Sequence, residues 1–403
     1  MEGSRPPHAE QKKIIFLTSM LTCKYGRFSL PKSITYLNCA YMAPLLKSVE
    51  KAGVRGVRLK RNPAIIKPGD FYSDQQSLKQ AFAKLINAND ANRIAVIPSV
   101  SYGMANVTRN ITITKGENIL VASEQFPSNY YPWQMLCQET GAELKVVAPD
   151  GESKERGKNW NLRFLENITN KTRVVAIANV HWTDGTLFDL KAIRKRTREV
   201  GALLIVDGTQ SVGALPIDVA EVDPDALICA SYKWLLGPYS IGLAYYGPHF
   251  DGGTPIEQNW INRLESENFS SLVSYQPEYQ PGAARYSVGE QSNFILVPMA
   301  LKAIEQINRW GVPNIQEYCE SISKDAIEKL REKGFIVEDL PYRSSHLFGV
   351  RHSKEIDPDK LRSVLTRHKI YVSIRGNAIR VSPHVYNDAD DLQRLVKALT
   401  SVV

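Results

Sequence analysis

The sequence predicts an α/β protein whose main sheet is mostly parallel. Short apolar runs rich in β-branched residues alternate with longer amphipathic stretches. This alternation is typical of strand and helix repeats in which helices cover both faces of a parallel sheet. The chain of 403 residues is also long enough to bury a core shared between two domains. We therefore expect a large α/β domain and a smaller second one.

The elements of the large domain follow one another between residues 49 and 290. The expected strands are 93–100, 118–123, 143–149, 173–180, 202–208 and 225–231. The basic stretch KAIRKRTREV at 191–200 carries apolar residues at helical spacing and is followed by a glycine. It is expected to be an amphipathic helix with a solvated cationic face.

From about residue 290 the pattern changes. The stretch FILVPMALKAIEQINRWG at 294–311 predicts a long helix that leads away from the sheet. Strands near 346–352 and 378–383 and a last helix at 388–402 follow it. These elements predict a smaller α+β domain over residues 291–403, with an N-terminal segment, 1–48, packed against it.

Composition excludes several classes of protein. The chain is 43% hydrophobic and 23% charged, as ordinary globular proteins are. Its net charge of +8 is not accompanied by a nucleic-acid-binding module or by interleaved aromatic residues, so no nucleic-acid partner is expected. No apolar stretch approaches the roughly 20 residues that a membrane helix needs. We expect no membrane partner.

Cysteine usage and the N-terminus indicate the compartment. The five cysteines form no CxxC pair, so neither a disulfide framework nor a metal site is predicted. The apolar run IIFLTSML at 14–21 is short and lacks a small-residue cleavage site, which argues against a signal peptide. The sequence favours a cytoplasmic protein.

Two charged residues stand in unusual settings. Asp207 follows the apolar run LLIV, at the carboxyl end of an expected strand, where open α/β sheets bind ligands; capping of the next helix would explain it equally well. Lys233 stands between Tyr232 and Trp234 and precedes two leucines. Desolvation there would favour the neutral amine that forms Schiff bases, whereas a snorkelling lysine is the structural alternative.

Together, DGTQ at 207–210 and SYKW at 231–234 resemble the signature of fold-type-I pyridoxal 5'-phosphate (PLP) enzymes. Specifically, they resemble the class V aminotransferase family, which includes cysteine desulfurases, isopenicillin-N epimerases and kynureninases. The resemblance implies that Asp207 holds the pyridinium nitrogen, Gln210 contacts the ring's phenolic oxygen and Lys233 forms the internal aldimine. An anionic partner keeps the ring protonated as an electron sink. The family also implies a sheet of the seven-stranded type and a homodimer with its sites at the subunit interface.

Other matched segments imply further cofactor contacts. The residues are Ser101 and Tyr102 at a helix start, Phe126, Trp182, Tyr232, Gln291 and Ser292. A helix N-terminus suits a phosphate, and an aromatic ring suits stacking on the cofactor. The sequence departs from the family at two of these segments. Trp182 replaces the usual asparagine, and Glu290 stands where a threonine from the second subunit is expected to contact the phosphate. Because a carboxylate repels phosphate, Gln291 or Ser292 is expected to make that contact.

The neighbouring His181 is expected to be a structural histidine rather than a catalytic acid. Near the C-terminus, SIRGNAIRVSP at 373–383 resembles the strand whose arginine grips the substrate's α-carboxylate. Arg380 is the matching residue, and a guanidinium can bind a carboxylate through two hydrogen bonds. Arg375 is a candidate for a side-chain carboxylate, with a surface arginine as the alternative.

The reaction stays open between three classes. No cysteine lies between Ile370 and Arg380, so the persulfide chemistry of desulfurases is not expected. We expect a small amino-acid substrate, α-proton abstraction by Lys233, and transamination or epimerisation. A β-lyase or hydrolase, such as a C–S lyase or a kynureninase-like enzyme, would use the same residues. A non-catalytic regulator with this fold is the third possibility.

Overall fold

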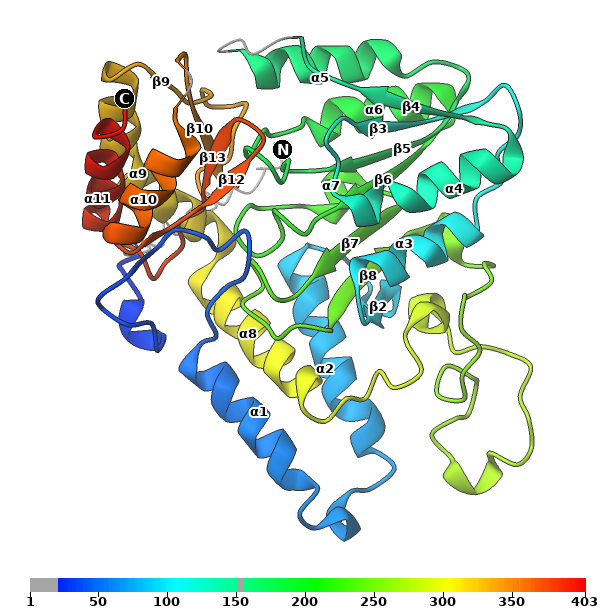
Figure 1. Cartoon of the computed structure of the whole chain (residues 1–403). Helices are drawn as coiled ribbons and strands as arrows, with labels where there is room; N and C mark the ends of the chain where they lie inside the picture. The colour runs from blue at the N-terminus through cyan, green and yellow to red at the C-terminus, as the bar shows by residue number, and fades with distance from the viewer. Residues whose placement is uncertain (1–20, 151–154, 355) are drawn as a thin grey trace, which may run out of the picture.

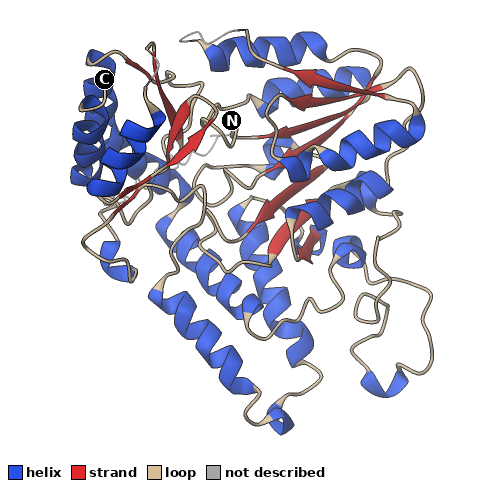
Figure 2. Cartoon of the chain, in the orientation of Figure 1, coloured by secondary structure: helices blue, strands red, loops and turns tan. Residues whose placement is uncertain are grey.

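The computed structural model describes residues 21–150, 155–354 and 356–403, and its largest element is a seven-stranded sheet (Figures 1 and 2). The strand order is β2-β8-β7-β6-β5-β3-β4. Strand β8 (Gly242–Tyr246) runs antiparallel to both neighbours, and the other pairs are parallel. The remaining strands are β2 (Ile94–Ile97), β3 (Asn118–Ala122), β4 (Glu143–Val147), β5 (Thr172–Ala178), β6 (Leu203–Asp207) and β7 (Ala226–Ala230). The predicted α/β fold with a mainly parallel sheet is confirmed.

Helices cover both faces of this sheet because alternate strand side chains enter two different cores. In β3, Leu120 belongs to one core and Val121 to the other, and in β6 the same holds for Leu204 and Ile205. The first core packs under α1 (Lys47–Leu59), α2 (Asp70–Leu85), α5 (Arg156–Asn167), α6 (Leu190–Val200), α7 (Val219–Val222) and α8 (Leu296–Trp310). The second packs under α3 (Val100–Arg109) and α4 (Tyr131–Thr140).

The C-terminal part of the chain forms a second, four-stranded sheet in the order β12-β13-β10-β9, beside the large sheet in Figure 1. Its strands are β9 (Phe335–Ile336), β10 (Phe348–His352), β12 (Ser373–Arg375) and β13 (Ala378–Val381). Its helices are α9 (Val312–Glu332), α10 (Pro358–Arg367) and α11 (Ala389–Thr400). The long helix expected at 294–311 is α8, and α9 begins directly after Gly311. The α+β character of this part agrees with the expected fold class.

The N-terminal segment joins the C-terminal part through a short parallel pair, β1 (Thr35–Tyr36) with β11 (Ile370–Tyr371). The domain boundaries at residues 48 and 290 stay predictions. Most of the apolar run at 14–21 lies outside the described residues. Short 3-10 helices are Tyr25–Arg27, Pro63–Ile65, Ala91–Arg93, Pro127–Asn129, Pro248–Phe250, Phe269–Ser271 and Gly282–Tyr286.

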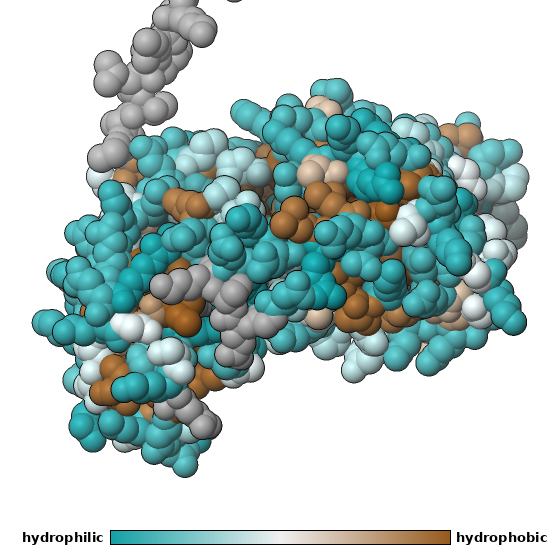
Figure 3. Space-filling view, turned by 90° about the horizontal axis from the view of Figure 1, so that it is seen from above, coloured by the Kyte–Doolittle hydropathy of each residue, from teal (hydrophilic) through white to brown (hydrophobic). Residues whose placement is uncertain are grey.

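The surface is mostly polar. On the face shown in Figure 3, hydrophilic residues predominate and hydrophobic ones gather in separate patches. Within the described ranges, no helix combines the length and the apolar character required to cross a bilayer. The same residues contain no cluster of three or more metal-ligating side chains.

Candidate active site

A cavity of about 290 Å³ opens where the parallel strands end. Ala178, Asp207 and Ala230 are the last residues of β5, β6 and β7, and all three line it. Open α/β sheets bind their ligands at this edge. The cavity brings together seven of the residues singled out from the sequence, which are Ser101, Phe126, Trp182, Asp207, Gln210, Tyr232 and Lys233.

Asp207 is a buried acid with little charge compensation. The residue is only 5% exposed, and its Oδ1 accepts a hydrogen bond from the Thr209 backbone N–H at 3.0 Å. Burial raises the pKa of the carboxyl, while the bonds from Thr209 and the charge of Lys233 act in the opposite direction. A cationic N–H donor in the cavity would stabilise its ionised form.

Lys233 is desolvated, as its apolar sequence neighbours predict. It is 5% exposed, and its Nζ lies 5.4 Å from the centroid of the Phe126 ring and 5.5 Å from that of Tyr232. Burial, together with the charges of Arg380 and Arg375, lowers the pKa of the ammonium to about 8, against the opposing charge of Asp207. The neutral amine is therefore accessible near physiological pH.

A tight turn after β7 presents this lysine to the cavity. The Gly237 N–H donates to the Ser231 carbonyl at 2.9 Å, and the Ser231 hydroxyl donates to the Pro238 carbonyl at 2.7 Å. Leu236 adopts φ 54°, a left-handed conformation that is rare for leucine. The closed turn holds the Lys233 backbone in one place.

The N-terminus of α3 forms another wall of the cavity. Ser99 caps the helix by accepting a bond from the Tyr102 backbone N–H at 3.2 Å, and its hydroxyl lies 2.9 Å from that of Ser101. Ser99, Val100 and Ser101 all line the cavity. Unpaired N–H groups of a first turn and the helix dipole favour an anion. The Tyr102 side chain is absent from the cavity wall, because its hydroxyl donates to Glu257 at 2.8 Å.

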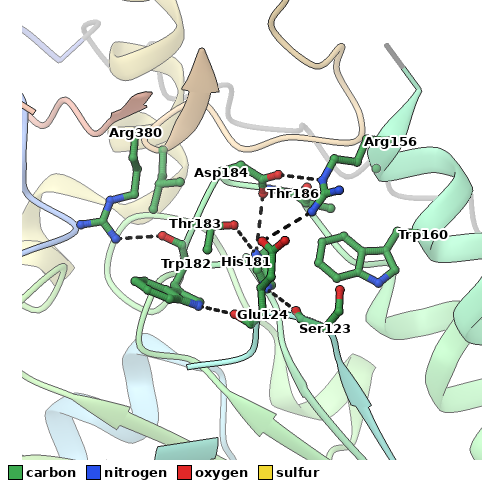
Figure 4. Close-up of polar contacts among 12 residues, drawn as sticks. Ser123, Glu124, Arg156, Trp160, His181, Trp182, Thr183, Asp184, Thr186 and Arg380 are labelled. Carbon is green, nitrogen blue, oxygen red and sulfur yellow. Dashed lines mark hydrogen bonds and ion pairs between the residues drawn. The ribbon is translucent and has the colours of Figure 1, made fainter. Parts of the chain in front are cut away.

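Phe126 and Trp182 stand together on the wall. Their ring centroids are 5.5 Å apart, with the planes at 82°. The Trp182 indole donates to the Glu124 carbonyl at 2.6 Å, and the Trp182 carbonyl accepts a bond from Arg380 at 2.8 Å (Figure 4). Trp182 is thus held from both sides.

Arg380 is a buried cation beside this cavity. It is 1% exposed and donates from Nη1 to Trp182 and from Nη2 to the Ser373 hydroxyl at 3.3 Å. Its Nε has no partner among the described residues. Burial lowers the pKa of the guanidinium to about 10, and Arg375 adds to this effect, so Arg380 stays charged at neutral pH. Neither arginine lines the cavity directly, but both contact Trp182, which does.

Gln210 is fixed by two hydrogen bonds. Its Nε2 donates to the Ala40 carbonyl at 3.1 Å, and its Oε1 accepts from the Trp234 indole at 2.8 Å. One N–H of the amide remains for a ligand oxygen.

Gln291 and Ser292 lie away from this chain's cavity. Gln291 donates to Asn262 at 2.8 Å, and Ser292 donates to the Phe71 carbonyl at 2.5 Å. Their expected phosphate contact would be made to a second subunit, and it stays a prediction.

His181 is fully buried, and its contacts support the expected structural role, which stays a prediction. Its Nε2 donates to the Ser123 carbonyl at 3.2 Å and its Nδ1 accepts from the Thr183 hydroxyl at 2.8 Å (Figure 4). Burial lowers the pKa of the imidazole, which keeps it neutral. Nearby, buried Asp184 binds Arg156 of α5 at 3.1 Å and Arg351 of β10 at 2.7 Å. These bonds fix the segment that carries Trp182.

The sequence reasoning missed several residues of the wall. They are Ser99, Gln125, Ser128, Thr209, Tyr239 and Ser240. Ser99 directly precedes the predicted helix start, and Thr209 lies within the DGTQ motif, so both had a local signal. Gln125 had none. Its Oε1 accepts a bond from the Phe126 N–H at 2.9 Å, and its Nε2 has no partner among the described residues.

Comparisons with known proteins agree on one family. The model of the family described as aminotransferase class-V matches residues 69–395. An uncharacterized aminotransferase of Bacillus subtilis, YcbU, is 26% identical over 80% of this chain and 82% of its own length. A cysteine desulfurase of Escherichia coli is 27% identical over 63% of this chain and 61% of the relative.

Solved structures share the fold. The cysteine desulfurase of Thermococcus onnurineus superposes with a TM-score of 0.80 at 19% identity, covering 94% of this chain and 96% of that one. A mutant of the protein C-DES, with glycine covalently linked to its PLP cofactor, gives a TM-score of 0.82 at 18% identity over 95% and 100% of the two chains. A second C-DES structure, described as a cystine C–S lyase bound to its product cysteine persulfide, gives 0.79 at 18% identity over 92% and 98%.

Proposed function

Because the chain belongs to the class V aminotransferase family and is a PLP-dependent enzyme that acts on an amino acid, we propose that its reaction is transamination or epimerisation. The observation that carries the PLP-dependent chemistry of this proposal, which a lyase would share, is the meeting of Lys233 and Asp207, two buried groups of opposite charge, in one cavity with a helix N-terminus. Each group had a structural explanation by itself. Their convergence in one cavity favours a catalytic role for the two residues over a structural one.

The donor set of the cavity fits PLP. Asp207 would hold the ring nitrogen, Gln210 the phenolic oxygen, and the first turn of α3 with Ser99 and Ser101 the phosphate. Tyr232 would assist at the phosphate. Phe126 and Trp182 supply aromatic surface for the ring. When bound, PLP supplies an aldehyde that exchanges amines and a protonated ring that withdraws electrons from the substrate's α-carbon.

Lys233 is the proposed catalytic residue. Its Nζ, in the neutral form, accepts the proton of the α-carbon and returns it. A pKa of about 8 places this group near the operating pH, where a base combines availability with strength. Its buried setting also keeps water from the proton that it moves.

Arg380 is proposed to bind the α-carboxylate. Its planar donors fix both oxygens, and its backbone lies in a strand pairing that holds the guanidinium in place. Orienting the substrate in this way decides which bond of the α-carbon reacts. Arg375 is proposed as a second substrate contact.

A β-lyase or hydrolase is the second candidate. It is favoured by the names of similar proteins, which include cysteine desulfurases and a cystine C–S lyase. The same Lys233 would then move the α-proton before a β-substituent leaves. The stretch between Ile370 and Arg380 contains no cysteine, so the residues do not favour persulfide transfer.

An assay of products separates these candidates. We expect the holoenzyme to form more than one equivalent of keto acid per site only when an amino-group acceptor is present, or to invert the α-carbon. Release of ammonia with pyruvate, or of alanine with a second acid, would instead establish the lyase or hydrolase. Lys233→Ala is expected to lower either rate by roughly 10²- to 10⁴-fold, the usual contribution of a positioned base. If this variant kept full activity, the role of Lys233 would be wrong.

We also propose a cytoplasmic homodimer. All five cysteines are free, which suits a reducing compartment. Large apolar side chains stand exposed, among them Tyr275 at 93% and Val273 at 83%. Exposed apolar surface of this kind is typical of a subunit interface.

A further inference from the structure

The β12–β13 hairpin carries two arginines on one face. Ser373 pairs with Arg380 and Arg375 pairs with Ala378 in an antiparallel register. Paired residues project from the same face, and residues two apart along a strand do so as well. Arg375 and Arg380 are therefore diagonal neighbours. The bond from Arg380 Nη2 to the Ser373 hydroxyl at 3.3 Å marks this face, and the opposite one carries Ile374 and Ile379.

No carboxylate of the described residues pairs with either arginine. Arg380 donates only to the Trp182 carbonyl and the Ser373 hydroxyl, and the Nη1 of Arg375 donates to the adjacent Ile374 carbonyl at 2.9 Å. The Nε of each guanidinium is buried and has no partner among these residues. Because a buried donor without an acceptor is costly, a ligand that supplies anionic oxygens would stabilise both.

Trp182 connects the pair to the cavity. The Cζ of Arg375 lies 5.4 Å from the centroid of the Trp182 indole, and Arg380 binds the Trp182 carbonyl. In Figure 4 the Arg380 guanidinium stands on the side of this residue opposite Glu124, to which the indole N–H is tied. The indole is fixed by its own hydrogen bond and holds the Arg375 cation by a cation–π contact. Both cations are thereby preorganised near Lys233.

Around Lys233, positively charged side chains outnumber negatively charged ones. Lys233 has Asp207 as its opposite charge, and the substrate's α-carboxylate would neutralise Arg380. Among the described residues, Arg375 is left without an anion. Resting on the proposed function, we propose that Arg375 binds a second carboxylate on the substrate, so that the enzyme selects acidic amino acids over their neutral analogues.

Binding titrations test this selection without relying on turnover. The holoenzyme is titrated with L-aspartate and L-glutamate and with the isosteric amides L-asparagine and L-glutamine. Binding is followed by the change in cofactor absorbance and, independently, by calorimetry. We expect the acid to bind about 10- to 100-fold more tightly than its amide, the size of a charge-assisted hydrogen-bonded pair. In Arg375→Gln this ratio is expected to fall to about 1, and in Arg375→Lys to an intermediate value.

A matched control is Arg362→Gln. Arg362 is an exposed arginine of α10 that pairs with Asp359, so this variant loses the same charge at a distant site. Its ratio is expected to equal that of the unmutated protein. The proposal is overturned if the unmutated holoenzyme binds the amides as tightly as the acids, or if Arg375→Gln or Arg375→Lys retains the full ratio. In those cases a bound cofactor shows that the site still holds PLP, and the product assay decides the proposed function separately. An unmutated protein that takes up no PLP overturns both.

Discussion

At the scale of single residues, the setting of a side chain explains the chemistry of this cavity better than its type. Lys233 is one of 50 basic residues, yet burial and two neighbouring arginines bring the pKa of its ammonium to about 8. The same cavity holds Asp207, whose burial raises its pKa. The pair is thereby poised to exchange protons with a ligand.

The lowered pKa of Lys233 predicts how the protein without cofactor takes up PLP. The amine must be neutral to attack an aldehyde, and it is neutral above its pKa. The rate of uptake is therefore expected to rise about tenfold per pH unit below pH 8 and to level off above it. Stopped-flow absorbance of the cofactor measures this rate. In Arg375→Gln the midpoint is expected to move to higher pH, because a charge that opposes protonation is lost. A midpoint near that of an ordinary lysine, about 10.4, would contradict the burial argument.

At the scale of elements, α3 shows how one serine serves both a helix and a ligand site. Ser99 satisfies the Tyr102 N–H and lies on the cavity wall. Gly103 lets the helix lie close to β7, since a Cβ there would stand 2.7 Å from the Ile228 side chain. The helix start is therefore fixed near the strand ends, where a phosphate would bind.

Ser99→Ala is expected to have two effects. Loss of the cap should lower the free energy of unfolding by about 1 kcal/mol. Loss of the hydroxyl at the proposed phosphate site should also weaken PLP binding several-fold. Asp189→Ala is the matched control, because Asp189 caps α6 in the same way, through the Ala192 N–H at 3.0 Å, away from the cavity. Chemical denaturation measures the free energy of unfolding, and cofactor titration measures the PLP affinity. Equal PLP affinity in the two variants would disprove the phosphate role of Ser99.

The sequence predicts the parallel strands well because most of them are short runs of apolar residues. The expected strand 118–123 is β3 at Asn118–Ala122, and 202–208 contains β6 at Leu203–Asp207. Strand β8 was not predicted. Its residues Gly242–Tyr246 contain glycine and alanine, which have weak strand propensity, and its burial depends on the neighbours β2 and β7.

Site residues, like strands, could be predicted where the local sequence marks them and not where their place depends on distant parts of the chain. Asp207 and Lys233 were found because local motifs mark them: Asp207 ends an apolar run, and Lys233 stands among apolar neighbours in sequence. The direction of the Tyr102 side chain was not predicted, because its hydrogen-bond partner, Glu257, lies 155 residues away in the sequence. Gln125 was missed for a similar reason, since its place on the wall depends on strands that the local sequence does not encode.

At the scale of the whole molecule, the segment between β8 and the 3-10 helix at Gly282–Tyr286 extends away from the body of the chain (Figure 1). Val273 and Tyr275 lie in this segment and are largely exposed. A second copy of the chain would cover them. The same arrangement would explain why Gln291 and Ser292, just beyond this segment, do not reach their own chain's cavity.

Replacing both Val273 and Tyr275 with glutamate is therefore expected to convert the proposed dimer to a monomer, because two charges would be buried at its interface. Sedimentation equilibrium measures the mass, and a cofactor titration of the same sample measures PLP affinity. If the partner completes the phosphate site, affinity should fall together with the mass. Leu162→Glu, at an exposed position of α5, adds charge elsewhere and should remain dimeric. A double variant that stays dimeric would place the interface on another face. One that becomes monomeric with unchanged PLP affinity would show that each chain binds the phosphate by itself, through α3 alone.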